Sequence, residues 1–286
     1  MSVRRLLSQS GIRPAAALGQ NFLIDAAVLD RIVLASDLAP RDVVLEIGAG
    51  TGELTRRLAD RAGCVVAIEL DHRLLPLLND GLAAYGNVHV VQGDILRLDP
   101  AKLIADATLG HDNLSRGYKV VANLPYYITS AILRHLLEAT LMPDVMVLTV
   151  QREVAQRITA APGSMSVLSV SVQLYAEPQV LFCIKPRSFY PSPNVESAVV
   201  RLVPRSAPLL PADKIDVFFR VVRAGFSQRR KQLHNALDAG LGPRASRDQI
   251  TAKLQEAAID PRRRAQALSI EEWISLTHAL GEDLEA

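Results

Sequence analysis

Five short apolar segments alternate with helical patterns along the first half of the chain, and this alternation constrains the fold most. Each segment has the length of a strand and is bounded by turn residues. Strands that alternate with helices predict a parallel, doubly wound sheet, because every crossover returns the chain to the same edge. The expected strands are residues 43–47, 64–70, 88–92, 119–122 and 144–150.

Two further apolar segments, 180–184 and 197–203, are joined without a helical pattern. We expect them to add an antiparallel hairpin at the edge of the sheet, which makes seven strands. The loop between them contains Phe189-Tyr190-Pro191-Ser192-Pro193, and its two prolines make it rigid and extended. Residues 164–176 combine a helical length with a strand-like valine/serine alternation, and we interpret them as a helix.

Residues 204–211 form a proline-rich linker, and only helical patterns follow it. We expect these helices at about 212–224, 228–239, 247–257 and 270–280, with Trp273 in the core of a small helical domain. The sequence thus predicts three parts, which are an N-terminal arm at 1–24, an α/β domain at 25–204 and a helical domain at 205–286.

Composition excludes several protein classes. The 286 residues contain no run of 18 apolar residues, and the first ten lack the apolar segment of a signal peptide, so we expect a cytoplasmic protein without a membrane span. Cys64 and Cys183 lie in apolar segments, and we expect two buried, reduced thiols. The six histidines show no ligand spacing, so no metal site is expected.

Charge is unevenly distributed, although the net charge is only +2. Residues 205–264 hold 13 basic and 6 acidic side chains, whereas 265–286 hold 5 acidic and no basic ones. Two basic clusters stand out, Arg229-Arg230-Lys231 at the start of an expected helix and 262–264 between two helices. Lysine and arginine bind phosphates without reading sequence, so these clusters indicate an RNA-binding surface; a solvated face is the alternative.

Glycines follow the first strand as Gly48-Ala49-Gly50-Thr51-Gly52. Glycine lets the backbone approach a ligand, and a helix start offers free amide groups; a plain tight turn is the alternative. A dinucleotide-binding loop has a third glycine where this chain has Glu53, whose carboxylate would repel a pyrophosphate. The loop therefore favours a ligand that carries no phosphate at this point.

Acidic residues end the next two strands. Glu69 lies 21 residues after Gly48, at the position of a carboxylate that accepts both hydroxyls of an unphosphorylated ribose. Asp94 ends the third strand and can accept a hydrogen bond from an adenine amine. Each acid alone could equally be a solvated loop residue. Together, the glycine loop, Glu69 and Asp94 place three suitable groups at successive strand ends, and this set fits S-adenosylmethionine.

The fourth strand ends in Asn123-Leu124-Pro125-Tyr126. The Asn123 amide oxygen and the Pro125 carbonyl can accept both hydrogens of one exocyclic amine, and the Tyr126 ring can stack on the base that carries it. This tetrapeptide resembles the signature of methyltransferases that act on nucleobase amino groups.

Together these motifs resemble the small-subunit ribosomal RNA adenine dimethyltransferase family (KsgA/RsmA type), a group of Rossmann-like class I methyltransferases. The resemblance runs from Gly19 to beyond Trp273. The segments that carry it are 19–23, 46–52, 93–94, 123–126, 151–155, 189–197 and 226–233.

The resemblance implies transfer of methyl groups from S-adenosylmethionine, without a metal, to N6 of two adjacent adenines near the 3′ end of 16S ribosomal RNA. The substrate would be the immature small subunit, and the enzyme would act as a monomer. Phe189 and Tyr190 would stack on a flipped base, with packing under the hairpin as an equal alternative. The cofactor would be held by Asn21, Leu23, Gly48, Gly50, Glu69, Asp94 and Asn123.

The chain departs from the family pattern just before Gly19, where Ala15 to Leu18 replace the usual basic residues. Three alternatives stay open. One is a large-subunit ribosomal RNA adenine methyltransferase of the antibiotic-resistance type, and another is a non-catalytic RNA-binding assembly factor. A nicotinamide dehydrogenase is disfavoured by Glu53.

Overall fold

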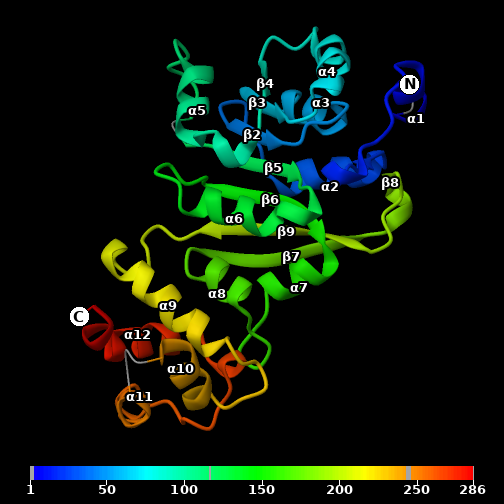
Figure 1. Ribbon diagram of the computed structural model, residues 1–286. Helices are drawn as coiled ribbons and strands as arrows, with labels where there is room; N and C mark the ends of the chain where they lie inside the picture. The colour runs from blue at the N-terminus through cyan, green and yellow to red at the C-terminus, as the bar shows by residue number, and fades with distance from the viewer. Residues whose placement is uncertain (1–2, 116, 243–245, 286) are drawn as a thin grey trace. The chain divides into compact units, whose positions relative to one another are not determined.

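The computed structural model describes residues 3–115, 117–242 and 246–285 (Figure 1). The chain divides into two compact units, Met1–Ala155 with Pro178–Pro204, and Gln156–Glu177 with Arg205–Ala286. The expected boundary after residue 204 is thus present, but 156–177 belongs to the helical unit rather than to the α/β unit. The reason is packing, because Val170 and Leu174 are part of the apolar core of the C-terminal helices.

The first unit is built on a seven-stranded sheet with the order β4-β3-β2-β5-β6-β9-β7, which confirms the expected number of strands. Neighbours from β4 to β6 are parallel, and β9 pairs with β6 in the antiparallel direction. The strands are β2 Val43–Ile47, β3 Cys64–Glu69, β4 Val88–Gln92, β5 Lys119–Asn123, β6 Val145–Gln151, β7 Ala176–Ile184 and β9 Ser197–Pro204.

Burial along the strands explains their sequences. Every residue of β2 and of β3 is buried, as expected for central parallel strands with both faces covered. At the edge, β7 is buried only at its two ends, Ala176 and Ile184, and Cys183 is exposed. The prediction of two buried thiols was therefore wrong for Cys183 and correct for Cys64, whose pKa is raised by burial.

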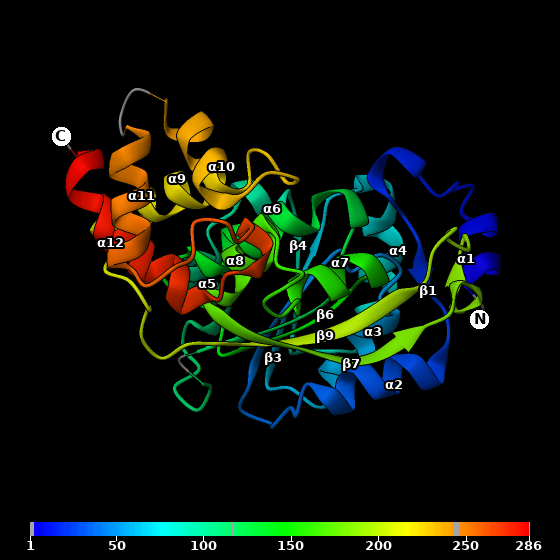
Figure 2. The ribbon, with the colours of Figure 1, turned by 90° about the horizontal axis from the view of Figure 1, so that it is seen from below.

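Helices pack on both faces of this sheet. Leu29 and Ile32 of α2 (Ala26–Ala35) and Leu58 of α3 (Glu53–Ala59) join the apolar cluster of one face, which includes Val65. Side chains of successive strand residues point in opposite directions, so Cys64 lies on the other face, where its sulfur is 3.9 Å from the Ala107 carbonyl oxygen. Figure 2 shows α2 on one side of β6 and β9 and α6 (Thr129–Leu137) on the other.

The remaining helices of this unit are short. They are α4 Leu75–Leu82, α5 Pro100–Thr108 and α7 Arg152–Ile158, of which α7 crosses into the second unit at residue 156. No helix among the described residues is both long and apolar enough to cross a bilayer.

The N-terminal arm has more regular structure than its sequence indicates. It forms α1 (Val3–Gln9), the 3-10 turn η1 (Ala16–Leu18) and β1 (Phe22–Leu23). Val3 and Leu7 are buried against Phe22 and Leu74, which anchors α1. Strand β1 pairs in the antiparallel direction with β8 (Phe189–Tyr190), in the loop before β9. An arm whose sequence lacks periodicity is thus ordered by long-range contacts.

The second unit is helical. The segment interpreted as a helix from its length contains α8 (Val167–Gln173), which confirms that interpretation. The C-terminal helices are α9 Ile215–Gly225, α10 Leu233–Leu241, α11 Arg247–Glu256 and α12 Ile270–Glu285. Trp273 is fully buried, as expected, and stacks on Phe226 with ring centroids 5.5 Å apart.

Arg229, Arg230 and Lys231 lie in the turn between α9 and α10, not at the start of a helix. The expected start near residue 228 was wrong because Gln232 is extended, with φ −66° and ψ 153°, so that α10 begins at Leu233. All three basic side chains are exposed.

Candidate active site

A pocket lies at the carboxyl ends of β2, β3, β4 and β5, next to the N-terminal arm. Parallel strands bring their carboxyl ends to one sheet edge, which is why motifs far apart in sequence meet here. Among the predicted site residues, those that line the pocket are Asn21, Gly48, Gly50, Glu69, Asp94, Asn123, Leu124, Pro125 and Tyr126.

Leu23 is the predicted cofactor residue that does not line the pocket. It is buried in the apolar cluster of the α2–α3 face, and Phe22 beside it lines the pocket instead. Gly48 and Gly50 adopt φ values of 75° and 59°, a region that favours glycine. A Cβ on Gly50 would lie 3.0 Å from the Phe22 ring, so the arm packs directly on the glycine loop.

Glu69 is buried, and its carboxylate is held by two backbone groups. Oε2 accepts a hydrogen bond from the Gly50 N–H at 2.7 Å, and Oε1 accepts one from the Asp71 N–H at 2.8 Å. Burial raises the pKa of Glu69, and the two backbone hydrogen bonds oppose this rise. Each carboxylate oxygen has a second lone pair, so the site can accept two further hydroxyl groups.

Asp94 follows β4 and caps the 3-10 turn η3 (Ile95–Arg97). Its Oδ1 accepts a hydrogen bond from the Leu96 N–H at 3.1 Å, while Oδ2 lies 3.8 Å from Arg97 Nε. The capping bond orients the side chain at the pocket, and Oδ2 retains capacity to accept from an amine.

Asn123 is the last residue of β5, and its amide is oriented by the arm. Nδ2 donates to the Asn21 carbonyl at 2.9 Å. A carbonyl only accepts, so this contact assigns the nitrogen to that side and the oxygen to the other. Oδ1 is buried and accepts no hydrogen bond among the described residues. A buried acceptor without a donor is costly, and here it borders a pocket.

The Pro125 carbonyl is engaged within the turn, contrary to the role expected for it. It accepts from the Ile128 N–H at 3.3 Å and from the Thr129 hydroxyl at 3.2 Å. These donors compete with a substrate amine for the two lone pairs of the Pro125 oxygen, although the Thr129 hydroxyl also lies 3.4 Å from the Tyr126 carbonyl. One residue earlier, the Leu124 N–H donates to the Thr149 carbonyl at 3.1 Å, which fixes the Asn123–Leu124 peptide.

Aromatic side chains complete the pocket. The Tyr126 hydroxyl lies 2.5 Å from the Ser197 Oγ, and burial raises its pKa while the hydrogen bond with Ser197 opposes the rise. Tyr127 also lines the pocket and is 57% exposed. Neither Tyr127 nor Ser197 was predicted as a site residue, although Tyr127 directly follows the 123–126 motif and Ser197 ends the 189–197 segment.

Phe189 and Tyr190 lie outside the residues that line this pocket. Phe189 is buried beside Leu23 in the apolar cluster, so the structure favours packing over base stacking for it. Tyr190 pairs with Phe22, and the Arg4 guanidinium lies 4.9 Å from its ring centroid.

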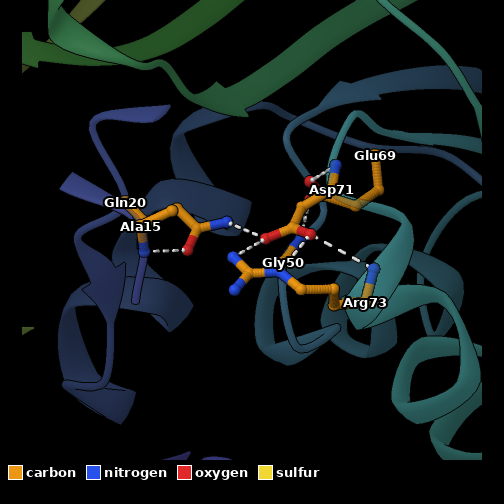
Figure 3. Close-up of polar contacts among 6 residues, drawn as sticks. All are labelled: Ala15, Gln20, Gly50, Glu69, Asp71 and Arg73. Carbon is orange, nitrogen blue, oxygen red and sulfur yellow. Dashed lines mark hydrogen bonds and ion pairs between the residues drawn. The ribbon is translucent and has the colours of Figure 1, made fainter. Parts of the chain in front are cut away.

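A polar network beside the pocket was not predicted from sequence (Figure 3). Asp71 accepts hydrogen bonds from Arg73 and from the Gln20 side chain, and Gln20 in turn accepts from the Ala15 N–H. The Arg73 contacts, followed in importance by that of Gln20, hold the pKa of Asp71 down at about 2. Gln20 lies in the 19–23 segment that resembles the family, but nothing in the sequence indicates that it contacts Asp71.

The other charged clusters are partly paired. In the second unit, Arg262 contacts Asp260 at 3.1 Å and Arg263 forms an ion pair with Glu272. Part of the 262–264 cluster therefore forms ion pairs within the helical unit, and part of it is exposed to solvent. Among the described residues, no group of histidine, cysteine and acidic side chains has the arrangement of a metal site.

Comparison with known proteins agrees with this geometry. Residues 13–280 match the model of a family described as ribosomal RNA adenine dimethylase. The chain belongs to the ribosomal RNA adenine dimethylase family. Ribosomal RNA small subunit methyltransferase A of Pelotomaculum thermopropionicum is 48% identical over 280 residues, which cover 96% of this chain and 94% of the relative. The protein of the same name from Moorella thermoacetica is 45% identical over 277 residues, with 96% and 95% covered.

Solved structures share the fold. The crystal structure of the 23S rRNA methyltransferase ErmE matches with a TM-score of 0.70 and 30% identity, over 91% of this chain and all of that one. A dimethyladenosine transferase from Plasmodium falciparum matches with a TM-score of 0.78 and 24% identity, over 92% of this chain and 98% of that one. The expected Rossmann-like methyltransferase fold is confirmed.

Proposed function

We propose that this chain dimethylates N6 of two adjacent adenines near the 3′ end of 16S ribosomal RNA, with S-adenosylmethionine as methyl donor. The observation that carries the proposal is the buried Asn123 Oδ1, an acceptor without a donor at the edge of a pocket. An exocyclic amine supplies the donor that this atom lacks, whereas a hydride-transfer reaction has no use for it.

The residues of the pocket fit S-adenosylmethionine. Glu69 has one lone pair left on each oxygen, which suits the two hydroxyls of a ribose. Asp94 Oδ2 suits the adenine amine, and Ile47, Ile68 and Ile95 supply apolar contact for the ring. Glu53 forms ion pairs with Arg56 and Arg57, so both arginines of this helix start are engaged by a carboxylate rather than left to bind a phosphate.

For the amine, we propose Asn123 Oδ1 and the Leu124 carbonyl as the two acceptors, since the Pro125 carbonyl is already engaged. The amine of adenine is a weak nucleophile because its lone pair is delocalised into the ring. Two acceptors draw its hydrogens out of the ring plane and localise that lone pair on nitrogen. Tyr126, oriented by Ser197, supplies a face for the base.

When bound, S-adenosylmethionine supplies an electrophilic methyl group. The protein contributes position and electrostatics, which account for large rate effects without a dedicated general base. Asn123 supplies the acceptor oxygen, and the hydrogen bond from its Nδ2 to the arm orients that oxygen.

Sequence identity favours small-subunit over large-subunit RNA as the substrate. The small subunit methyltransferases reach 48% identity, whereas the large-subunit enzyme ErmE reaches 30%. The exposed Arg229, Arg230 and Lys231 offer phosphate contacts that read no sequence, so they support RNA binding without distinguishing the two RNAs. We further propose that the enzyme works as a monomer, in the cytoplasm, on immature small subunits.

Labelled methyl transfer to unmethylated small and large subunits, followed by nucleoside analysis and primer extension, tests the function. We expect dimethyladenosine at two adjacent positions of 16S RNA and none in 23S RNA. Label in 23S RNA, or on another base, would overturn the proposal. With Asn123→Ala, turnover should fall by roughly 10²–10³-fold. Donor binding, measured by calorimetry, should change far less; near-normal turnover would refute the role of Asn123.

A further inference from the structure

The Gln20 side chain connects the N-terminal arm to the turn after β3, beside the donor pocket. Its Oε1 accepts from the Ala15 N–H at 2.7 Å, and its Nε2 donates to Asp71 Oδ2 at 2.8 Å. The oxygen of the Gln20 amide therefore binds another part of the arm, and its nitrogen binds the turn after β3. Figure 3 shows both contacts meeting at this side chain.

Asp71 is a rigid anchor for this contact. Arg73 donates to it from Nε at 2.8 Å and from Nη2 at 2.6 Å, and the Arg73 backbone N–H donates at 3.1 Å. With Gln20, four donors reach a carboxylate that is only 4% exposed. Its own N–H donates to Glu69 Oε1 at 2.8 Å, so the anchor is continuous with the floor of the pocket.

The residue after Gln20 contacts the proposed catalytic amide. The Asn21 carbonyl accepts from Asn123 Nδ2 at 2.9 Å. An asparagine amide turns readily about its last torsion, where two orientations are nearly equivalent. With Nδ2 on the arm, Oδ1 takes the other side, where the proposed function places the amine, whereas the reverse orientation would set an NH₂ group against a substrate amine, donor against donor. Something must select the orientation, and in this structure the arm carbonyl does so.

We propose that Gln20 is a positioning residue, which holds the arm in register so that the Asn21 carbonyl selects the productive orientation of Asn123. This inference rests on the proposed function, because it assigns the arm to the amine-accepting side of the site. It differs from a role of the arm in covering the donor alone, which would require no contact with Asn123.

Replacement Gln20→Met keeps the length of the side chain and removes both hydrogen bonds. We expect kcat to fall by roughly tenfold to a hundredfold, the cost of a misplaced catalytic group, with little change in the donor dissociation constant. In an Asn123→Ala background the same replacement should cause no further loss, because its target is gone. The matched control is Gln9→Met, an exposed glutamine of α1, which should leave kcat unchanged.

A spectroscopic readout separates this proposal from the proposed function. The side-chain NH₂ signals of Asn123, assigned by their absence in Asn123→Ala, should show slowed hydrogen exchange in the wild type and lose that protection in Gln20→Met. Retained protection, a loss of kcat that adds fully to that of Asn123→Ala, or weakened donor binding at normal kcat would each overturn the positioning role. If protection behaves as expected but no adenine is methylated, the proposed function alone fails.

Discussion

Replacing Glu69 by glutamine tests the donor site with a change of a single atom. Both carboxylate oxygens accept backbone hydrogen bonds, from Gly50 at 2.7 Å and from Asp71 at 2.8 Å. A glutamine has one oxygen, so its NH₂ group must face one of these N–H donors in either orientation. The variant therefore loses one charge-assisted hydrogen bond and gains a donor–donor contact, at Gly50 in one orientation and at Asp71 in the other.

The contact with the donor sets the magnitude, because the NH₂ group of a glutamine cannot accept a hydrogen bond from a ribose hydroxyl as a carboxylate oxygen can. A hydrogen bond to a charged group contributes about 1.5–3 kcal/mol, and about 1.4 kcal/mol is a tenfold change in an equilibrium constant. We therefore expect the dissociation constant for S-adenosylmethionine to rise by roughly tenfold to a hundredfold, with smaller effects on kcat at saturating donor.

Isothermal calorimetry measures this effect directly. Glu53→Gln is the matched control, because Glu53 pairs with Arg56 and Arg57 on α3 and does not line the pocket. The control should bind the donor as the wild type does. An unchanged dissociation constant in Glu69→Gln would show that this carboxylate does not contact the donor and that the loop tolerates its loss, and would refute the reasoning.

Two further predictions concern stability. Burial raises the pKa of Glu46 to about 8 from its ordinary 4.5, so the folded state holds a proton that the unfolded state releases, and stability falls as pH rises between these values. The free energy of unfolding of Glu46→Gln, relative to that of the wild type, should rise by more than about 1.4 kcal/mol between pH 5 and pH 8.5, as measured by urea unfolding. A difference between the two proteins that stays constant with pH would contradict this. In the helical unit, a Cβ on Gly225 would lie 2.5 Å from the Trp273 ring, so Gly225→Ala should lose about 1–3 kcal/mol. Gly281→Ala in α12, with no described atom within 4 Å of the added Cβ, should gain about 0.5–1 kcal/mol, and equal melting temperatures for the two variants would contradict the packing argument.

The sheet and most of the pocket were predictable because they depend on local patterns. Short apolar segments between helices define parallel strands, and parallel strands end at one edge. Glu69 and Asn123 end such strands and Asp94 lies two residues after β4, so their meeting in one pocket follows from the succession of strands. The four C-terminal helices likewise follow from periodicity, although the start of α10 was misplaced by an extended residue at Gln232.

Contacts between distant segments were decided only by the tertiary structure. Pairing of β1 with β8 orders the arm and buries Phe189. Nothing in the sequence of either segment indicates that it pairs with the other. Whether the Pro125 carbonyl is free depends on how the next turn closes. The orientation of Asn123 depends on Asn21, which is 102 residues away. Sequence patterns report local conformation and burial, whereas a hydrogen bond between remote groups depends on where the whole chain places them.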